Sequence, residues 1–119
     1  MAIETVRLSQ QGKDQLVKLK RLTGVKQWNY LCRWALAASL SDPSLPLVRD
    51  VVTDSNVEMT WKTFAGDNGD VYAALVAQRA ALEGRDEYAV FTSHLHRGIG
   101  ELAGQAPKGI EELVAISVS

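Results

Sequence analysis

The chain has 119 residues, of which 46% are hydrophobic and 23% charged, as in one ordinary globular domain. Its single cysteine excludes a framework of internal disulfides and a zinc site built from several cysteines. The net charge of −1 would on its own argue against a nucleic-acid binder. The longest nearly apolar stretch, 34–40, is far shorter than the roughly 20 residues that span a membrane. Because the start of the chain also lacks the apolar core of a secretory signal, we expect a soluble, cytoplasmic protein that makes no membrane contact.

The first predicted elements are a short strand and a helix. Residues 3–8 alternate in polarity and favour a strand. Ser9 is a suitable N-cap for a helix over 10–22, and Thr23-Gly24 predicts its end, because glycine tolerates the left-handed conformation that follows many helices. Leucines occupy one face of this helix. Its basic residues lie on the opposite face and its flank, and they are Lys13, Lys18, Lys20 and Arg21.

A second helix is predicted over 27–40, after a very short turn that carries Lys26. It ends before Pro43, because proline cannot continue the hydrogen-bond ladder. Residues 43–69 then form a long connection, with an extended piece expected at 57–64.

Two further helices follow the connection. Asp70 and Asp86 are the predicted N-caps of helices over 71–83 and 87–103. The second of these carries an apolar stripe at helical spacing, formed by Phe91, Leu95, Ile99 and Leu102. Residues 109–116 are expected to add one or two helical turns.

The order of elements suggests an oligomer. A lone strand leaves an unpaired edge, which two copies can remove by pairing their strands as an antiparallel ribbon. We therefore predict a mainly α, ribbon–helix–helix-like protomer with a short N-terminal strand and about four helices. In such folds the strand can enter a DNA groove while nearby cations hold phosphates, so Arg7 is a candidate contact. Alternatively, Arg7 pairs with Glu4 or with an acidic residue of a neighbouring chain.

Charge is distributed unevenly along the chain. Residues 1–34 carry seven basic and two acidic side chains, whereas residues 35–119 carry six basic and twelve acidic ones. Such a basic segment indicates a local anion-binding surface, although a solvated, lysine-rich helix face would give the same pattern. Lysine is a flexible point charge that suits backbone phosphates better than base edges.

Three segments resemble the DndE family of bacterial DNA phosphorothioation, which is a sulfur modification of DNA. They are VRLSQQGKDQLVKLKRLTGV at 6–25, GDVYAALVAQR at 69–79 and FTSHLHRGIGEL at 91–102. The last is similar to the family's aromatic-x-x-His-Leu-x-Arg-Gly signature. The resemblance covers most of the chain, in the same order and at about the same length.

The resemblance implies a homotetramer that holds duplex DNA, preferably nicked, and that is not itself the sulfur-transfer enzyme. It also implies work with the other Dnd proteins, which are a cysteine desulfurase, a reductase-like component and an ATPase. The basic residues carried over to DNA binding are those of the first helix and its turn: Lys13, Lys18, Lys20, Arg21 and Lys26.

Several residues that suggest chemistry have simpler explanations. Cys32 could carry a persulfide, but it shares an apolar face and is expected to be buried. His94 and His96 point about 200° apart on a helix, so they cannot chelate one ion, and His94 is expected to be a hydrogen-bonded packing residue. Arg97 is expected to pair with Glu101 rather than with phosphate.

No catalytic signature stands out. Gly12-Lys13 is not a phosphate-binding loop, because no glycine stands five residues earlier and Asp14 replaces the Ser or Thr. We expect no enzyme activity, no cofactor and no metal. Two alternatives to the phosphorothioation subunit remain, namely a ribbon–helix–helix transcriptional regulator and a protein-interaction adaptor that binds no DNA.

Overall fold

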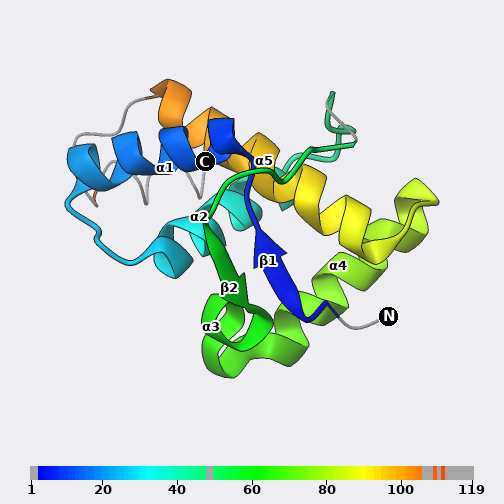
Figure 1. Cartoon of the computed structure of the whole chain (residues 1–119). Helices are drawn as coiled ribbons and strands as arrows, with labels where there is room; N and C mark the ends of the chain where they lie inside the picture. The colour runs from blue at the N-terminus through cyan, green and yellow to red at the C-terminus, as the bar shows by residue number, and fades with distance from the viewer. Residues whose placement is uncertain (1–2, 48–49, 106–108, 110, 112–119) are drawn as a thin grey trace.

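The computed structural model describes residues 3–47, 50–105, 109 and 111 (Figure 1). Its long helices are α1 (Gln10–Thr23), α2 (Trp28–Leu40), α4 (Gly69–Glu83) and α5 (Glu87–Gln105). The short elements are β1 (Thr5–Arg7), β2 (Glu58–Thr60), α3 (Trp61–Ala65) and the 3-10 turn η1 (Gly66–Asn68). This confirms a mainly α fold with a short first strand and four long helices. The turns predicted at 109–116 fall mostly outside the described residues.

Helix α1 begins and ends as its sequence predicts. The Ser9 hydroxyl oxygen accepts a hydrogen bond from the backbone N–H of Gly12 at 2.9 Å, which satisfies one of the free donors of the first turn. At the other end Gly24 has φ 75°, the left-handed conformation that glycine adopts without strain. The bounds of α1 are therefore set locally.

The first strand finds its partner within the chain. β1 pairs antiparallel with β2, with Val6 opposite Met59 (Figure 1). This removes the reason for expecting a ribbon between two copies, because β1 is not a lone strand. The extended piece predicted at 57–64 is also shorter than expected. It turns into α3 after Thr60, whose hydroxyl oxygen accepts from the Thr63 N–H at 3.1 Å.

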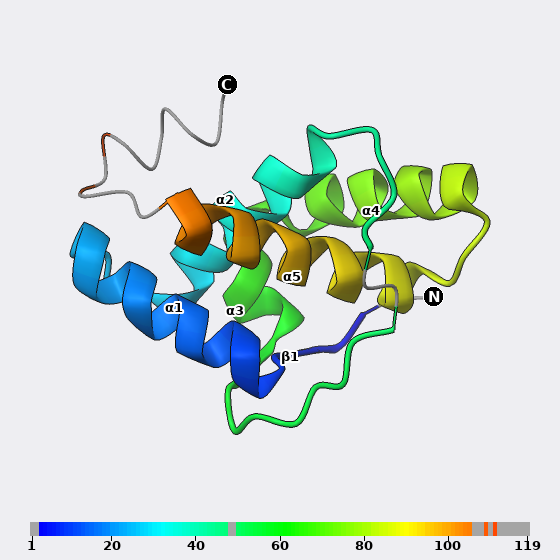
Figure 2. The same ribbon diagram turned by 90° about the horizontal axis from the view of Figure 1, so that it is seen from above.

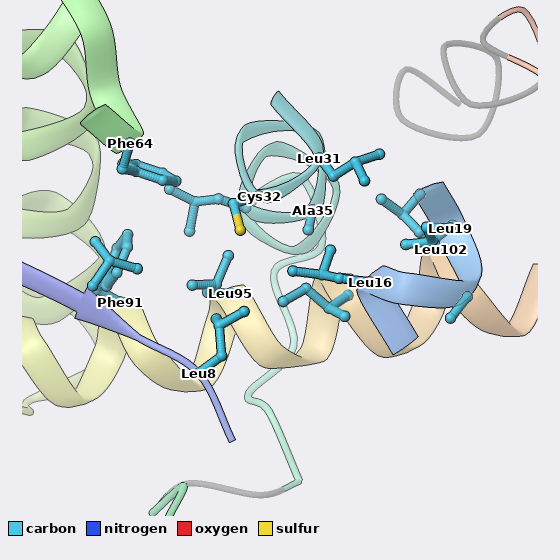
Figure 3. Packing of buried hydrophobic residues seen from close by; sticks show 14 of the residues in the cluster. Leu8, Leu16, Leu19, Leu31, Cys32, Ala35, Phe64, Phe91, Leu95 and Leu102 are labelled. Atoms are coloured by element: carbon cyan, nitrogen blue, oxygen red, sulfur yellow. The ribbon is translucent and has the colours of Figure 1, made fainter. Parts of the chain in front are cut away.

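Helix α5 is the centre of the fold, since it packs against α1, α2 and α4 (Figure 2). Its predicted apolar stripe is buried, together with leucines of α1 and α2 (Figure 3). The backbones of α2 and α5 touch at Gly98 of α5. A Cβ built there would lie only 1.8 Å from the carbonyl oxygen of Ala35 in α2. The glycine therefore determines how closely α2 and α5 approach.

The two aspartate caps have different outcomes. A carboxylate oxygen of Asp86 accepts from the Ala89 N–H at 3.1 Å, as an N-cap should. The prediction for Asp70 is wrong, because α4 begins at Gly69 and Asn68 occupies the cap position. The turn η1 runs directly into α4, so the helix starts earlier than its composition suggests and Asp70 lies in its first turn.

Candidate nucleic-acid interface

Helix α1 directs its basic side chains in different directions. Its buried residues are Gly12, Leu16 and Leu19, so Lys13 and Lys20 lie along one edge, seven residues apart. Arg21 points away from the buried face and is exposed. The sequence places all three on the outer side of the helix, and the structure agrees with this.

Lys13 and Lys20 each have a contact outside α1. Lys13 contacts the segment before β2, and Lys20 contacts the start of α2. The Lys13 ammonium donates to the side-chain oxygen of Asn56 at 2.6 Å. The Lys20 ammonium lies 4.2 Å from the centre of the Trp28 ring, a cation–π distance. These contacts hold both charges on the same side of the molecule.

Two of the predicted contact residues are already engaged within the chain. Lys18, on the other edge of α1, donates to the carbonyl oxygen of Ala103 at 3.1 Å near the end of α5. Arg7 forms an ion pair with Glu58 at 2.8 Å across the small sheet. An acidic partner was anticipated for Arg7, but it comes from β2 of the same chain. These two residues are therefore not part of one continuous cluster with the others.

The turn from α1 to α2 gathers positive charge. Lys26 is exposed just before Gln27, the N-cap of α2. No side chain caps this helix start and no acidic residue lies in its first turn, so its free N–H groups carry an uncompensated partial positive charge. Among the described residues, neither Arg21 nor Lys26 has a hydrogen-bond or ion-pair partner, and both are available to a ligand.

A groove of about 460 Å³ opens between this edge of α1, the start of α2 and the segment around β2. We call it the amide groove, after the three carboxamide side chains that line it, Gln27, Asn29 and Asn56. Lys13, Trp28 and Glu58 also line it. Sequence reasoning missed the amides because Asn56 comes from the long connection, far along the chain from Gln27 and Asn29 at the start of α2.

A second polar cluster is buried between α2, α4 and α5. The ring nitrogens of His94 lie 2.8 Å from the Ser39 hydroxyl and 2.6 Å from a Glu83 carboxylate oxygen. Serine, histidine and carboxylate in this order resemble a nucleophilic triad. Ser39 and His94 are both 0% exposed, however, so no substrate reaches them. Burial lowers the pKa of His94 and favours its neutral form, in agreement with its predicted packing role.

Two arginines from other helices cap the end of α2. Arg79 donates to the Asp42 carbonyl at 3.1 Å, and Arg97 donates to the Ser39 carbonyl at 2.8 Å. Arg97 also bonds the Ser39 hydroxyl and Ser44, whereas Glu101 lies farther away at 3.9 Å. The structural role predicted for Arg97 is confirmed. Its main partners, however, are carbonyl and hydroxyl oxygens of Ser39 and Ser44, which lie far away along the chain.

His96 connects α5 to the start of α1. Its Nε2 accepts from the backbone N–H of Ser9 at 3.0 Å, and its Nδ1 donates to the Thr92 carbonyl at 2.7 Å. The carbonyl can only accept and the N–H can only donate, so the ring is neutral. Burial lowers the pKa of His96 and reinforces this state.

The remaining candidates point to packing. Cys32 is buried and burial raises the pKa of its thiol to about 12, which leaves it as a small apolar residue. Within the part of the chain that is described, no three His, Cys, Asp or Glu side chains gather where they could hold a metal ion. None of the described helices is long and apolar enough to cross a membrane.

A comparison with models of known protein families shows to which family this chain belongs. The family model of DNA sulphur modification protein DndE matches residues 5–108. The chain belongs to the DndE family. Membership connects the protein with DNA phosphorothioation modification. No curated protein matches the chain.

Solved DndE structures share the fold. A crystal structure of DndE from Escherichia coli B7A, involved in DNA phosphorothioation modification, has a TM-score of 0.70 at 23% identity and covers 86% of this chain and 98% of its own. The crystal structure of a DndE mutant with two glycine-to-lysine substitutions has a TM-score of 0.64 at 19% identity, covering 85% and 99%. In this DndE chain the 91–102 segment forms the middle of α5, where its residues pack and cap neighbouring helices.

Proposed function

We propose that this DndE family member is a non-catalytic, DNA-binding subunit of the phosphorothioation system, and that it holds duplex DNA, preferably nicked. The observation that carries the proposal is the pair Arg21 and Lys26, exposed and without partners among the described residues. Arg21 follows Lys20 in the last turn of α1, and Lys26 comes directly before the uncapped start of α2. Together these groups form a surface that attracts anions, and contacts of such cations with phosphates hold DNA without reading its sequence.

The spacing along α1 suits a phosphate backbone. Seven residues separate Lys13 from Lys20, which is about 10 Å along a helix axis. This distance separates the two charges enough for their flexible side chains to reach different phosphates of one backbone. Lys20 is held over Trp28, and therefore loses less side-chain freedom when it binds than an unsupported lysine would.

A binding role without catalysis accounts for the buried reactive groups. The serine and histidine of the triad-like cluster are inaccessible, and so is the thiol of Cys32. Sulfur transfer is therefore assigned to the other Dnd proteins: the desulfurase, the reductase-like component and the ATPase. We place all of these together in the cytoplasm, where the DNA is.

Assembly into a homotetramer is part of the proposal. Helix α4 carries a stripe of exposed apolar side chains, with Val71 58%, Leu75 43% and Leu82 76% exposed. Such a stripe favours packing against another protein surface. Repeating the basic surface of α1 in a symmetric assembly would strengthen a field that is modest in one copy, because the whole chain has a net charge of −1.

The experiment is a titration of matched intact, nicked and sequence-scrambled duplexes at several salt concentrations, with the oligomer mass measured in parallel. Arg21→Gln and Lys26→Gln should each weaken binding to every sequence. The log–log salt slope should become less steep by about 0.9 for each phosphate that the variant no longer neutralises. Ala73→Glu, on a side of α4 away from the apolar stripe, also lowers the net charge by one; it is the matched control and should leave the slope unchanged.

Other outcomes favour the alternatives. Tight binding to one sequence by a dimer would indicate a transcriptional regulator. Failure to bind any duplex would leave the adaptor, which uses its surface for protein partners alone. Equal affinity for nicked and intact duplexes would remove the preference for nicks but keep the DNA-binding role.

A further inference from the structure

We infer that the amide groove holds one unstacked nucleotide of the bound DNA, as a second contact beside the phosphate surface. The inference rests on the proposed DNA-binding role and adds a ligand to it, namely a base that has left the stack. It differs from a preference for nicks, because the bases at a nick remain paired. The groove lies directly beside the lysine edge of α1, so a base inside it is joined to phosphates within reach of Lys13 and Lys20.

The groove offers hydrogen-bond groups of both kinds. The Asn29 amide nitrogen donates to the Thr63 carbonyl at 3.0 Å, which orients the side chain and leaves its oxygen as an acceptor. The Asn56 oxygen accepts from Lys13, which leaves its amide nitrogen as a donor. In the described part of the chain, the Gln27 amide has no partner. Carboxamides pair well with the edges of bases, since both present a donor next to an acceptor.

The shape of the groove selects an isolated base over a duplex. Its volume of about 460 Å³ is within the range of small-molecule sites, and it is a partly open groove on the surface. The convex side of a duplex presents only backbone to such a groove, whereas a base swung out of the stack can enter. Trp28 forms part of the wall and supplies an aromatic surface, which bases of any kind can contact.

The charges around the groove are compatible with a nucleotide. Glu58 is the carboxylate in its lining, and it is paired with Arg7 at 2.8 Å, so its repulsion of a phosphate is reduced. Lys13 stands at the same wall and can exchange its bond to Asn56 for a phosphate oxygen. An extended peptide could also use the amides, but the cations along α1 favour a ligand that carries negative charge.

The test compares three duplexes of one sequence: intact, nicked with all bases paired, and carrying a single unpaired nucleotide. We expect the unpaired nucleotide to raise the affinity of the unmodified protein about tenfold over the intact duplex. In the double variant Gln27→Ala/Asn29→Ala, which leaves Lys13 and its partner Asn56 in place, this preference should fall below about twofold while the affinity for intact duplex is kept. Gln11→Ala, which removes an exposed amide on the opposite edge of α1, is the matched control and should keep the preference.

A fluorescent base analogue at the unpaired position gives a second readout, because its emission changes when it leaves the stack. Thermal unfolding of the double variant shows whether it is folded. Three results would overturn the inference. The first is equal affinity for the intact and unpaired duplexes, which leaves the proposed function standing. The second is a preference that survives in the double variant. The third is failure to bind any duplex, which removes the proposed function as well and leaves the groove to a peptide.

Discussion

The close contact between α2 and α5 requires that Gly98 carries a hydrogen atom where other residues carry a Cβ. The substitution Gly98→Ala therefore tests the fold directly. The added Cβ would lie 1.8 Å from the Ala35 carbonyl oxygen, about half of an ordinary van der Waals separation. The obstacle is backbone and cannot rotate away, so the two helices have to separate. Because this contact is in the centre of the core, separation also disturbs the packing of Leu31 and Leu95.

The magnitude follows from two opposing effects. Overpacking a core costs up to about 3 kcal/mol, and replacing glycine by alanine inside a helix returns about 1 kcal/mol. The free energy of unfolding should therefore fall by about 2 kcal/mol, which lowers Tm by roughly 6–10 °C in a domain of this size. Urea unfolding followed by circular dichroism measures the first quantity, and a thermal melt measures the second.

Gly100→Ala is the matched control, two residues away on the same helix. Its Cβ would meet only the side chain of Gln15, at 3.7 Å, which is ordinary contact. This variant should be as stable as the unmodified protein or more stable, by up to about 1 kcal/mol. If Gly98→Ala matched Gly100→Ala in stability, the close approach of α2 and α5 would be refuted.

Three further predictions concern buried and partly buried groups. Burial lowers the pKa of His96, so as the pH falls the unfolded chain takes up a proton before the folded protein does. The contribution of His96 to the free energy of unfolding is therefore fully present above the ordinary pKa of about 6.5 and is lost as the pH drops below it. His96→Gln, which can still accept from Ser9, should reduce this loss when the free energy of unfolding is compared between pH 8 and pH 5, and an unchanged loss would contradict the role of His96. Cys32 should not react with a maleimide in the native protein and should react once it is unfolded; rapid native labelling would show that it is accessible. Arg97→Lys should lower the free energy of unfolding by about 2–4 kcal/mol, because one ammonium cannot replace a guanidinium that donates to several oxygens. Arg21→Lys on the surface is the control and should change the free energy of unfolding by less than about 0.5 kcal/mol.

The helix positions were predictable because their signals are local. Ser9, Gly24 and Asp86 act through backbone groups within four residues of themselves, and the structure confirms all three. The buried stripe of α5 follows from the period of the helix alone. Asp70 shows the limit of this reasoning, because its position depends on how η1 joins α4.

The basic character of α1 was likewise visible in the sequence, since charge is a property of the residues themselves. Which cations are available was not visible. Lys18 is engaged by the end of α5 and Arg7 by β2, while Lys26 is left exposed in the turn. Both engaged cations have partners that lie far away along the chain.

The sequence by itself therefore determined the four long helices, the caps at Ser9, Gly24 and Asp86, and the presence of a positively charged first segment, because each depends on neighbours within a few residues. Only the tertiary structure decided the partner of β1, the capping of α2 by Arg97 and the gathering of three amides beside Lys13. The physical reason is the same in each case. These contacts join distant segments, and their free energy is gained only once the core has brought those segments together.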